Sequence, residues 1–230
     1  MPRRNAPRHG APRKHAAPFR CRLVVMAKAP VAGRVKTRLA REIGVAQATR
    51  FARCATLALL QRLTRDRRWE TTLAVTPDVG SASRFWPRGV ALVAQGPGDL
   101  GARMQRIFTL LPPGPVVIVG TDIPDLRAAH IAQAFRRLGR HDAVFGPAAD
   151  GGYWLVGLKR RPRVLRCFQA VRWSSPHALA DTMRNLDGRS VAQLVTLCDV
   201  DGAQEFARCA GHFGRRIGRA SVPQSSLAVD

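Results

Sequence analysis

Acidic residues are scarce in this chain of 230 residues: 15 Asp and Glu stand against 38 Lys and Arg, which gives a formal net charge of +23 at pH 7. Lysine is scarce as well, with four residues, so almost all of the positive charge is arginine. A basic surface attracts polyanions such as nucleic acid, nucleotides or acidic lipid. A solvated surface with a high ratio of arginine to lysine explains the charge more simply, so the charge does not identify a partner.

Long apolar runs and paired cysteines are also missing. No apolar run reaches the roughly 18 residues that span a bilayer, and the N-terminus lacks the apolar stretch of a signal peptide. The five cysteines are scattered and form no CxxC pair, so neither a zinc site nor a disulfide framework is predicted. We therefore expect a cytoplasmic protein with reduced cysteines and no transmembrane segment.

The length suits one sizeable hydrophobic core rather than two. Residues 1–20 carry six positive charges, no acid and several prolines, and such a segment buries too little apolar surface to become ordered. We predict a disordered basic arm there and a flexible tail at 216–230. A single domain then occupies residues 21–215.

Short apolar runs predict strands, and longer amphipathic segments between them predict helices. Their alternation predicts a Rossmann-like α/β fold, with a mostly parallel sheet and helices on both faces. In such sheets ligands bind at the carboxyl ends of the strands. The predicted strands are 23–27, 72–76, 90–94, 116–119, 143–145, 153–156 and 191–197, and the predicted helices are 35–63 with a break near Gly44, 99–111, 126–138, 176–186 and 203–213.

The loop after the first strand combines a flexible glycine with four cations. Backbone N–H groups and the positive end of the following helix add to its attraction for a polyphosphate. The spacing is neither that of a Walker loop nor that of GxGxxG, and an ordinary turn into a basic helix is the alternative. The candidate nucleotide-binding residues of this loop are Lys28, Gly33, Arg34, Lys36 and Arg38.

An acidic residue directly follows the most apolar strand, 116–119. Asp122 is placed there for a ligand or a metal, whereas Asp125 is expected to cap the next helix. Mg²⁺ and Mn²⁺ are hard cations, and such ions take one or two carboxylates and complete their shell with substrate phosphates. We therefore predict that Asp122 is both a metal ligand and a catalytic residue.

A second acidic site lies near the C-terminus, where a predicted strand leads into a predicted helix. Strand alternation places Asp199 and Asp201 on the same side if the strand continues. One of them is expected to cap the last helix with Glu205 as a reciprocal partner. The other is then free to reach a metal shared with Asp122.

Two glycine-rich segments complete the candidate site. In the first, Gln95, Asp99 and Gly101 lie in a turn into a helix, where a base or ribose can approach the backbone closely. The second segment joins two strands through an Asp-Gly-Gly sequence, which is also typical of a plain hairpin. Asp150, Gly151, Gly152 and Tyr153 are its candidate catalytic and acceptor-binding residues.

Six of these motifs occur together and in order, and together they resemble a known family. They are residues 26–39, Gly-Asp-Leu-Gly-x-Arg-Met around Asp99, Gly-Thr-Asp-Ile-Pro-Asp-Leu, Gly-Pro-Ala-x-Asp-Gly-Gly-Tyr, Trp-Ser-Ser-Pro and Asp-Val-Asp. The chain resembles, from about residue 22 to 213, bacterial GT-A-fold proteins described as arsenosugar-biosynthesis-type glycosyltransferases. The wider superfamily includes the guanylyltransferases of molybdenum cofactor and of phospholactate.

The resemblance implies a GT-A fold, a site for Mg²⁺ or Mn²⁺ and roles for individual residues. Gly33, Arg34 and Lys36 would bind nucleotide phosphates. Asp122 would be the metal-binding counterpart of the DxD motif, and Asp201 would match the late metal ligand of the nucleotidyltransferases. The family more often has Glu before the Asp-Gly-Gly-Tyr sequence, and Ala149 stands there in this chain, which puts activity in question.

These observations favour glycosyl transfer from a nucleoside-diphosphate sugar to a small-molecule acceptor, with Asp150 as the base if the reaction inverts the sugar. The same fold also supports nucleotidyl transfer from a nucleoside triphosphate to a phosphorylated small molecule. An inactive nucleotide sensor is a third interpretation. A nucleic-acid-binding protein is a fourth, but the chain lacks interleaved aromatics and any known binding motif, so no specific nucleic acid is expected.

Overall fold

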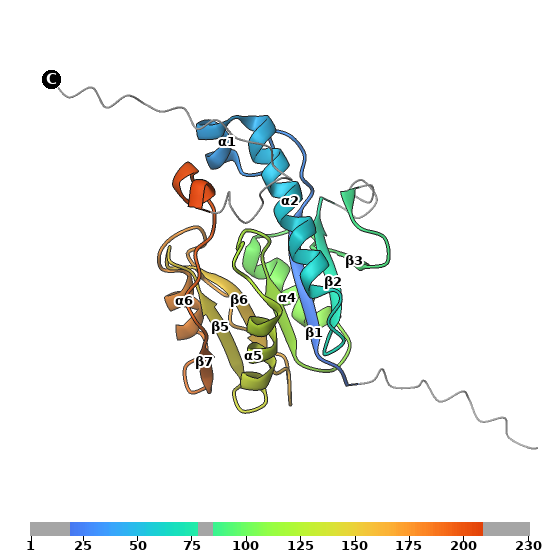
Figure 1. The fold of residues 1–230 in the computed structure, drawn as a ribbon. Helices are drawn as coiled ribbons and strands as arrows, with labels where there is room; N and C mark the ends of the chain where they lie inside the picture. Colours follow the sequence, from blue (N-terminus) through green and yellow to red (C-terminus); the bar gives the residue numbers. More distant parts are fainter. Residues whose placement is uncertain (1–18, 78–84, 209–230) are drawn as a thin grey trace, which may run out of the picture.

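The computed structural model describes residues 19–77 and 85–208. A seven-stranded sheet in the order β3-β2-β1-β4-β6-β5-β7 forms its centre (Figure 1). The basic arm predicted at 1–20 lies outside the described residues except for its last two, and the tail predicted at 216–230 lies wholly outside them. The strands are β1 Arg22–Lys28, β2 Glu70–Thr76, β3 Ala91–Ala94, β4 Val116–Val119, β5 Ala143–Pro147, β6 Tyr153–Leu158 and β7 Val191–Gln193.

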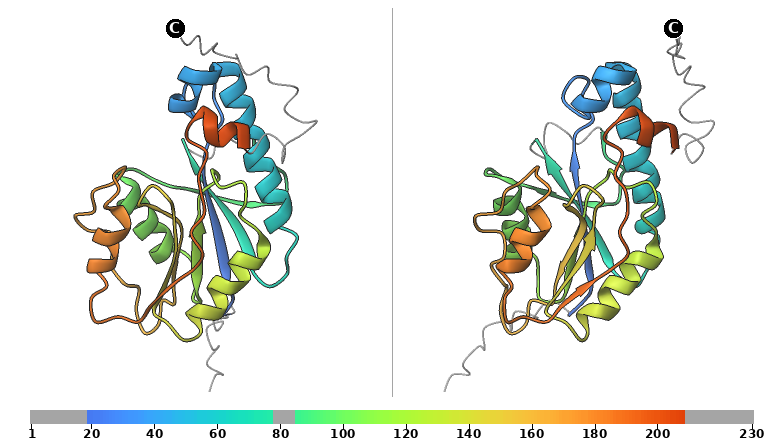
Figure 2. Two further views of the ribbon diagram at one scale, coloured as in Figure 1. Left: turned by 60° about the vertical axis from the view of Figure 1, so that its left-hand side comes forward. Right: turned by 90° about the vertical axis from the view of Figure 1, so that its left-hand side faces the viewer.

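Helices cover both faces of this sheet (Figure 2). On one face α2 and α5 pack against β1, β2 and β4, and on the other α4 and α6 pack against β4, β5 and β6. The predicted mixed α/β architecture is therefore confirmed. The helices are α1 Thr37–Ile43, α2 Val45–Leu63, α4 Leu100–Leu110, α5 Ala128–Leu138 and α6 Ala178–Arg184.

The sheet is mostly parallel, as predicted, with one antiparallel strand. β6 lies between β4 and β5 and runs antiparallel to both, whereas the other pairs are parallel. All four residues of β4 are buried, as expected for a strand covered on both faces. The carboxyl ends of β1, β2 and β4 therefore meet at one edge, and the loop between β5 and β6 returns to the same edge.

Three local predictions are wrong. The N-cap of α5 is Arg127, not Asp125, because a turn closed by the N–H of Leu126 on the carbonyl of Ile123 delays the helix. The predicted strand 191–197 ends at Gln193, and the predicted helix 176–186 is shortened to 178–184. Within the described residues, no helix has the length and apolar character needed to cross a membrane.

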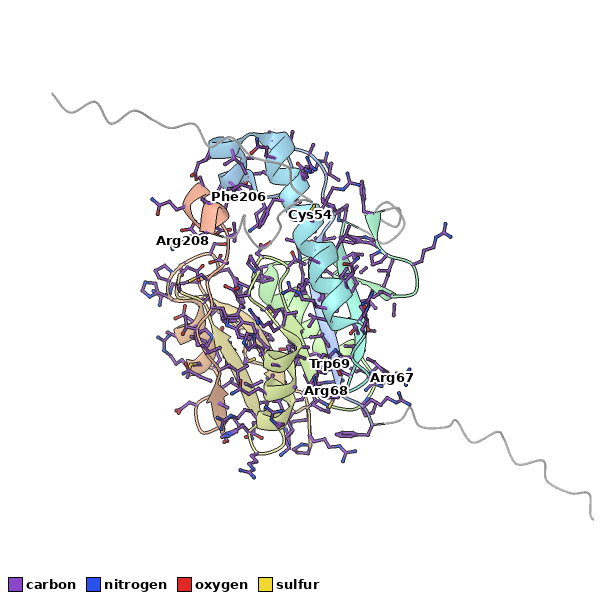
Figure 3. The ribbon with its side chains drawn as sticks, viewed as in Figure 1. Cys54, Arg67, Arg68, Trp69, Phe206 and Arg208 are labelled. Carbon is purple, nitrogen blue, oxygen red and sulfur yellow. The ribbon has the colours of Figure 1, made fainter. Side chains whose placement is uncertain are left out.

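The last described segment, residues 203–208, is helical and packs on α1 and α2. The ring of Phe206 meets that of Phe51 edge-on, with centroids 5.3 Å apart. Figure 3 labels Phe206 and Cys54, whose side chains lie where this helical turn meets α2. This small apolar cluster holds the preceding residues, 199–201, beside the loop that leads into α1.

Candidate functional site

Lys36 joins two acidic residues that are distant in sequence. Its Nζ lies 3.0 Å from Oδ2 of Asp122 and 3.2 Å from Oδ1 of Asp201, and it donates to the carbonyl of Val200 at 2.7 Å. The Lys36 side chain is 7% exposed, whereas both carboxylates are about half-exposed. The predicted proximity of Asp122 and Asp201 is therefore present, and both carboxylates bind the same cation.

The local backbone explains how Lys36 reaches this position. Lys36 is the N-cap of α1 and has φ 48° and ψ 47°, the left-handed conformation that non-glycine residues rarely adopt. The N–H of Val200 donates to the carbonyl of Asp122 at 3.1 Å, which ties the segment of Asp201 to the end of β4. Three chain segments thus meet at one point.

A pocket of about 360 Å³ opens beside the two carboxylates. Four acidic residues and three aromatic residues line it, and its described lining contains no Lys, Arg or His. Among the described residues, no three His, Cys, Asp or Glu side chains are grouped to hold a metal ion. The lining residues are Leu100, Gly120, Asp122, Ile123, Ala148, Asp150, Gly152, Tyr153, Trp154, Trp173, Ser174, Ser175, Ala178, Asp199 and Asp201.

The β5–β6 hairpin positions Asp150 at the pocket. Oδ1 of Asp150 accepts the N–H of Gly152 at 2.9 Å, which fixes the carboxylate in a local turn. Gly151 has φ +84°, and a Cβ at this position would collide with the backbone of Pro176. Glycine is therefore required here for the hairpin to pack against the segment before α6. Ala149 is exposed, and its N–H donates to the carbonyl of Leu197.

Aromatic rings form the apolar wall of the pocket. Tyr153 meets Phe145 and Trp173 edge-on, at centroid distances of 5.2 and 6.4 Å. Burial raises the pKa of the Tyr153 phenol far above its ordinary value, so this group stays protonated and does not serve as a base near neutral pH. Its oxygen lies 3.5 Å from Oγ1 of Thr182, at the limit of a hydrogen bond.

Asp199 is a further acid in the pocket. Burial raises the pKa of its carboxyl above the ordinary value, the negative charges of Asp201 and Asp150 raise it further, and Lys36 opposes them. The strand predicted to carry Asp199 and Asp201 on one side ends earlier, at Gln193. Both residues nevertheless line the same pocket, because the segment between β7 and the last helical turn follows its rim.

An ion pair between the exposed side chain of Arg172 and the buried carboxylate of Asp181 holds the loop that carries Trp173. Arg172 donates through Nε and Nη2 to the two oxygens of Asp181, both at 2.9 Å, and its backbone N–H donates to the same carboxylate at 3.1 Å. Arg184 adds a second cation, with its Nη1 3.2 Å from Oδ1 of Asp181. These donors hold the pKa of the Asp181 carboxyl well below its ordinary value, so it stays ionised near neutral pH. Its bonds to Arg172 fix the residue next to Trp173 in the pocket wall.

Replacing Asp181 with Asn is expected to lower the melting temperature near neutral pH, since it removes the charge that binds Arg172. A carboxyl whose folded pKa is depressed stabilises the fold above its unfolded pKa, near 3.8, and loses that contribution as the pH falls through and below this value. Acid unfolding followed by circular dichroism should therefore be less steep below about pH 4 in the variant. Asp187→Asn, at an exposed position, is the matched control. Identical acid profiles of wild type and Asp181→Asn would contradict this role.

The other predicted nucleotide-binding residues lie on two sides of the site. Lys28, Gly33, Arg34 and Arg38 are exposed in the segment from the end of β1 to the start of α1. Nη1 of Arg38 lies 3.4 Å from Oδ2 of Asp201, so this cation faces the acidic pair.

The glycine-rich turn before α4 has structural roles that the sequence did not predict. The Gln95 amide is buried and donates to the carbonyls of Ala27 and Ala74, which links it to β1 and β2. Asp99 caps α4 by accepting the N–H of Ala102 at 2.7 Å. Gly101 allows close packing, since a Cβ there would meet the ring of Trp173.

A second hollow, of about 410 Å³, lies between α4 and residues 164–169. Arg166 is the one charged residue of its described lining, and the remaining polar groups are amides and a hydroxyl. It begins at Gly101, in the first turn of α4, and lacks the acids that converge around Lys36. We therefore place the candidate site in the pocket that Asp122 and Asp201 line.

Comparison with known proteins agrees with this architecture. Residues 59–175 match the model of a family described as an uncharacterised protein conserved in bacteria (DUF2064), and the chain belongs to this family. None of the curated proteins compared with the chain matches it. A crystal structure of a proposed nucleotide-diphospho-sugar transferase from Desulfovibrio desulfuricans G20 is 27% identical, with a TM-score of 0.78 over 89% of this chain and 92% of that one. The chain thus has a GT-A-like fold.

More distant structures share the fold alone. Rv0371C from Mycobacterium tuberculosis H37Rv, in complex with manganese, is 17% identical, with a TM-score of 0.51 over 84% of this chain and 98% of that one. CMP:2-keto-3-deoxy-manno-octonic acid synthetase complexed with CTP is 10% identical, with a TM-score of 0.53 over the same shares.

Sequence reasoning missed part of the pocket wall. Trp173, Ser174 and Ser175 line the pocket, although none of them is among the predicted site residues. The Trp-Ser-Ser-Pro motif was the available signal, since a helix start does not by itself explain a tryptophan. The role of Asp181 could not be predicted from the sequence, because nothing distinguishes its partner Arg172 from the many other arginines of the chain.

Proposed function

We propose that this protein is a metal-dependent glycosyltransferase that uses a nucleoside-diphosphate sugar and a small-molecule acceptor. The observation that carries the proposal is the pocket beside Asp122 and Asp201, which combines aromatic rings and carboxylates and has no basic residue in its described lining. Four of the chain's acids line this pocket although the chain as a whole has a formal net charge of +23. Such a lining suits a neutral hydroxylated molecule.

On the donor side, the chemistry of Asp122 and Asp201 fits a divalent metal. Two carboxylates already converge on one cation, the ammonium of Lys36. Mg²⁺ and Mn²⁺ prefer oxygen ligands, and Mg²⁺ typically binds one or two carboxylates together with substrate phosphates. A metal bound there would offset the charge that develops on the leaving diphosphate. We infer that the phosphates bind to Lys28, Arg34 and Arg38 and to the backbone at Gly33, all in the exposed segment between β1 and α1 or in its first turn.

On the acceptor side, Asp150 would remove the proton of the attacking hydroxyl if the reaction inverts the sugar. A general base must lie within about 3 Å of that proton, and the hairpin turn holds the Asp150 carboxylate at the pocket. Gly151, Gly152 and Tyr153 shape this wall, and Trp173 offers an apolar face for a sugar ring. Asp199 adds a second acid beside the acceptor.

Nucleotidyl transfer is the alternative on the same fold, as in the synthetase that binds CTP. Its acceptor carries a phosphate, which Asp150 and Asp199 would repel. Opposite charges placed close together attract strongly in a partly buried site and like charges repel as strongly. The acidic pocket therefore favours an uncharged acceptor. This favours a function like that of the arsenosugar-biosynthesis-type glycosyltransferases over one like that of the guanylyltransferases.

We also propose that residues 21–215 act as one domain.

A thermal-shift screen of nucleotides and nucleotide sugars with Mn²⁺ tests the donor. A ligand present at about 100 times its dissociation constant stabilises the folded state by about 2.7 kcal/mol, which corresponds to roughly 5–10 °C for a domain of this size. We expect such a shift for a nucleoside-diphosphate sugar only when Mn²⁺ is present. Shifts for triphosphates alone would favour the nucleotidyl alternative, and the absence of any shift would contradict nucleotide binding.

A further inference from the structure

Each carboxylate oxygen of the acidic pair, Asp122 and Asp201, lies within 3.4 Å of one of the protein's own cations or hydroxyl groups. Lys36 binds Oδ2 of Asp122 and Oδ1 of Asp201, and Arg38 lies 3.4 Å from Oδ2 of Asp201. The remaining oxygen, Oδ1 of Asp122, lies 3.4 Å from the hydroxyl of Thr121. Two carboxylates and two cations therefore form a local group whose formal charges cancel.

A divalent cation and the Lys36 ammonium compete for these oxygens. A metal at about 2.0–2.6 Å from a carboxylate oxygen replaces hydrogen bonds to that oxygen. With Lys36 and Arg38 in place, adding the ion would leave a local excess of two positive charges. The Lys36 side chain is nearly buried, so this repulsion is less screened by solvent than that of a surface pair.

A nucleotide diphosphate changes this balance. Its negative charges offset those of the metal, and its oxygens offer the Lys36 ammonium a new acceptor. The four-carbon stem of lysine lets its ammonium move between neighbouring acceptors without moving the backbone.

We propose that Lys36 is an exchangeable counter-ion of the metal site, which keeps Asp122 and Asp201 from binding a divalent cation until a nucleotide diphosphate takes the ammonium. The proposal rests on the proposed function only in that Asp122 and Asp201 hold the metal. It assigns Lys36 a coupling role between metal and donor in addition to phosphate binding. Coupling between two ligands is reciprocal. If bound metal raises the affinity for nucleotide by a given factor, bound nucleotide raises the affinity for metal by the same factor.

The test is metal binding without nucleotide. Free Mn²⁺ is titrated against the full chain by electron paramagnetic resonance, for wild type and Lys36→Met. Removal of the competing ammonium is expected to tighten Mn²⁺ binding at least about tenfold, within the usual range of coupling factors. Calorimetry with UDP and GDP at fixed Mn²⁺ should show the opposite effect, with weaker nucleotide binding in the variant.

Two further variants make the result specific. Lys36→Gln keeps a donor for the carbonyl of Val200 but removes the charge, so it should reproduce the tighter Mn²⁺ binding even if Lys36→Met folds poorly. Lys159→Met is the matched control, because Lys159 follows β6 at the opposite edge of the sheet and should not alter Mn²⁺ affinity.

The outcomes distinguish failure of the metal site from failure of the counter-ion role of Lys36. If neither wild type nor the Lys36 variants bind Mn²⁺, with or without nucleotide, the metal site itself fails and the proposed function fails with it. If wild type binds Mn²⁺ and both Lys36 variants bind it equally or more weakly, the site stands and the counter-ion role is overturned. Tighter binding in both Lys36 variants but not in Lys159→Met supports the proposal.

Discussion

Replacing Asp122 with alanine is expected to weaken Mn²⁺-dependent nucleotide binding more than about 100-fold, beyond the 10- to 100-fold typical of groups that only support a metal ligand. Asp122 contributes one of the two carboxylates that converge on Lys36, so its loss leaves Asp201 alone. The side chain is 50% exposed and lies after β4. The fold should therefore remain intact, with a melting temperature close to that of wild type.

Asp125→Ala is the matched control for this experiment. Asp125 lies three residues further along the same loop, is exposed, and does not line the pocket. Isothermal titration calorimetry with Mn²⁺ and with Mg²⁺ should therefore give near wild-type affinity for the control. Unchanged nucleotide binding by a folded Asp122→Ala protein would refute the site.

Replacing Asp150 with asparagine is expected to slow transfer by about 10²- to 10⁴-fold, the usual contribution of a general base. Asparagine keeps an oxygen that can accept the N–H of Gly152, so the turn should persist while the charge is lost. Donor binding should change little, because Asp150 belongs to the acceptor side of the pocket. The turnover number with a neutral acceptor, compared with donor affinity, separates these effects.

Asp199→Asn provides the comparison for Asp150. It removes a second charge from the same pocket without removing the proposed base, so a smaller loss of turnover is expected. If both variants lose activity equally, the pocket acts through its summed charge rather than through one base. A loss of less than about tenfold in Asp150→Asn would contradict its role as general base.

The fold could be predicted from local patterns, and its order of strands could not. Apolar runs such as Val116–Val119 are read directly as buried strands, and Gly44 marks the break between α1 and α2. The place of β6 between β4 and β5 was not predictable in this way. The Asp-Gly-Gly sequence is typical of a hairpin and so favours an antiparallel pair of β5 and β6, but the pairing of β6 with β4 depends on tertiary packing.

The site was predicted in part because strand ends are fixed by topology. The rule that ligands bind at the carboxyl ends of strands identified Asp122, and the ordered motifs added Asp201. The contact of Lys36 with Asp201 spans 165 positions in sequence and depends on the packing of Phe206 against Phe51. No local pattern encodes such a contact, nor the ion pair of Arg172 with Asp181.

The most direct test of the central claim is the product released from the donor. Purified protein with Mn²⁺ is offered nucleoside-diphosphate sugars and nucleoside triphosphates, with neutral and phosphorylated acceptors in parallel, and phosphorus NMR identifies the product. We predict release of a nucleoside diphosphate that depends on Mn²⁺, is fastest with neutral acceptors and is lost in Asp122→Ala. Release of pyrophosphate with a phosphorylated acceptor would contradict glycosyl transfer.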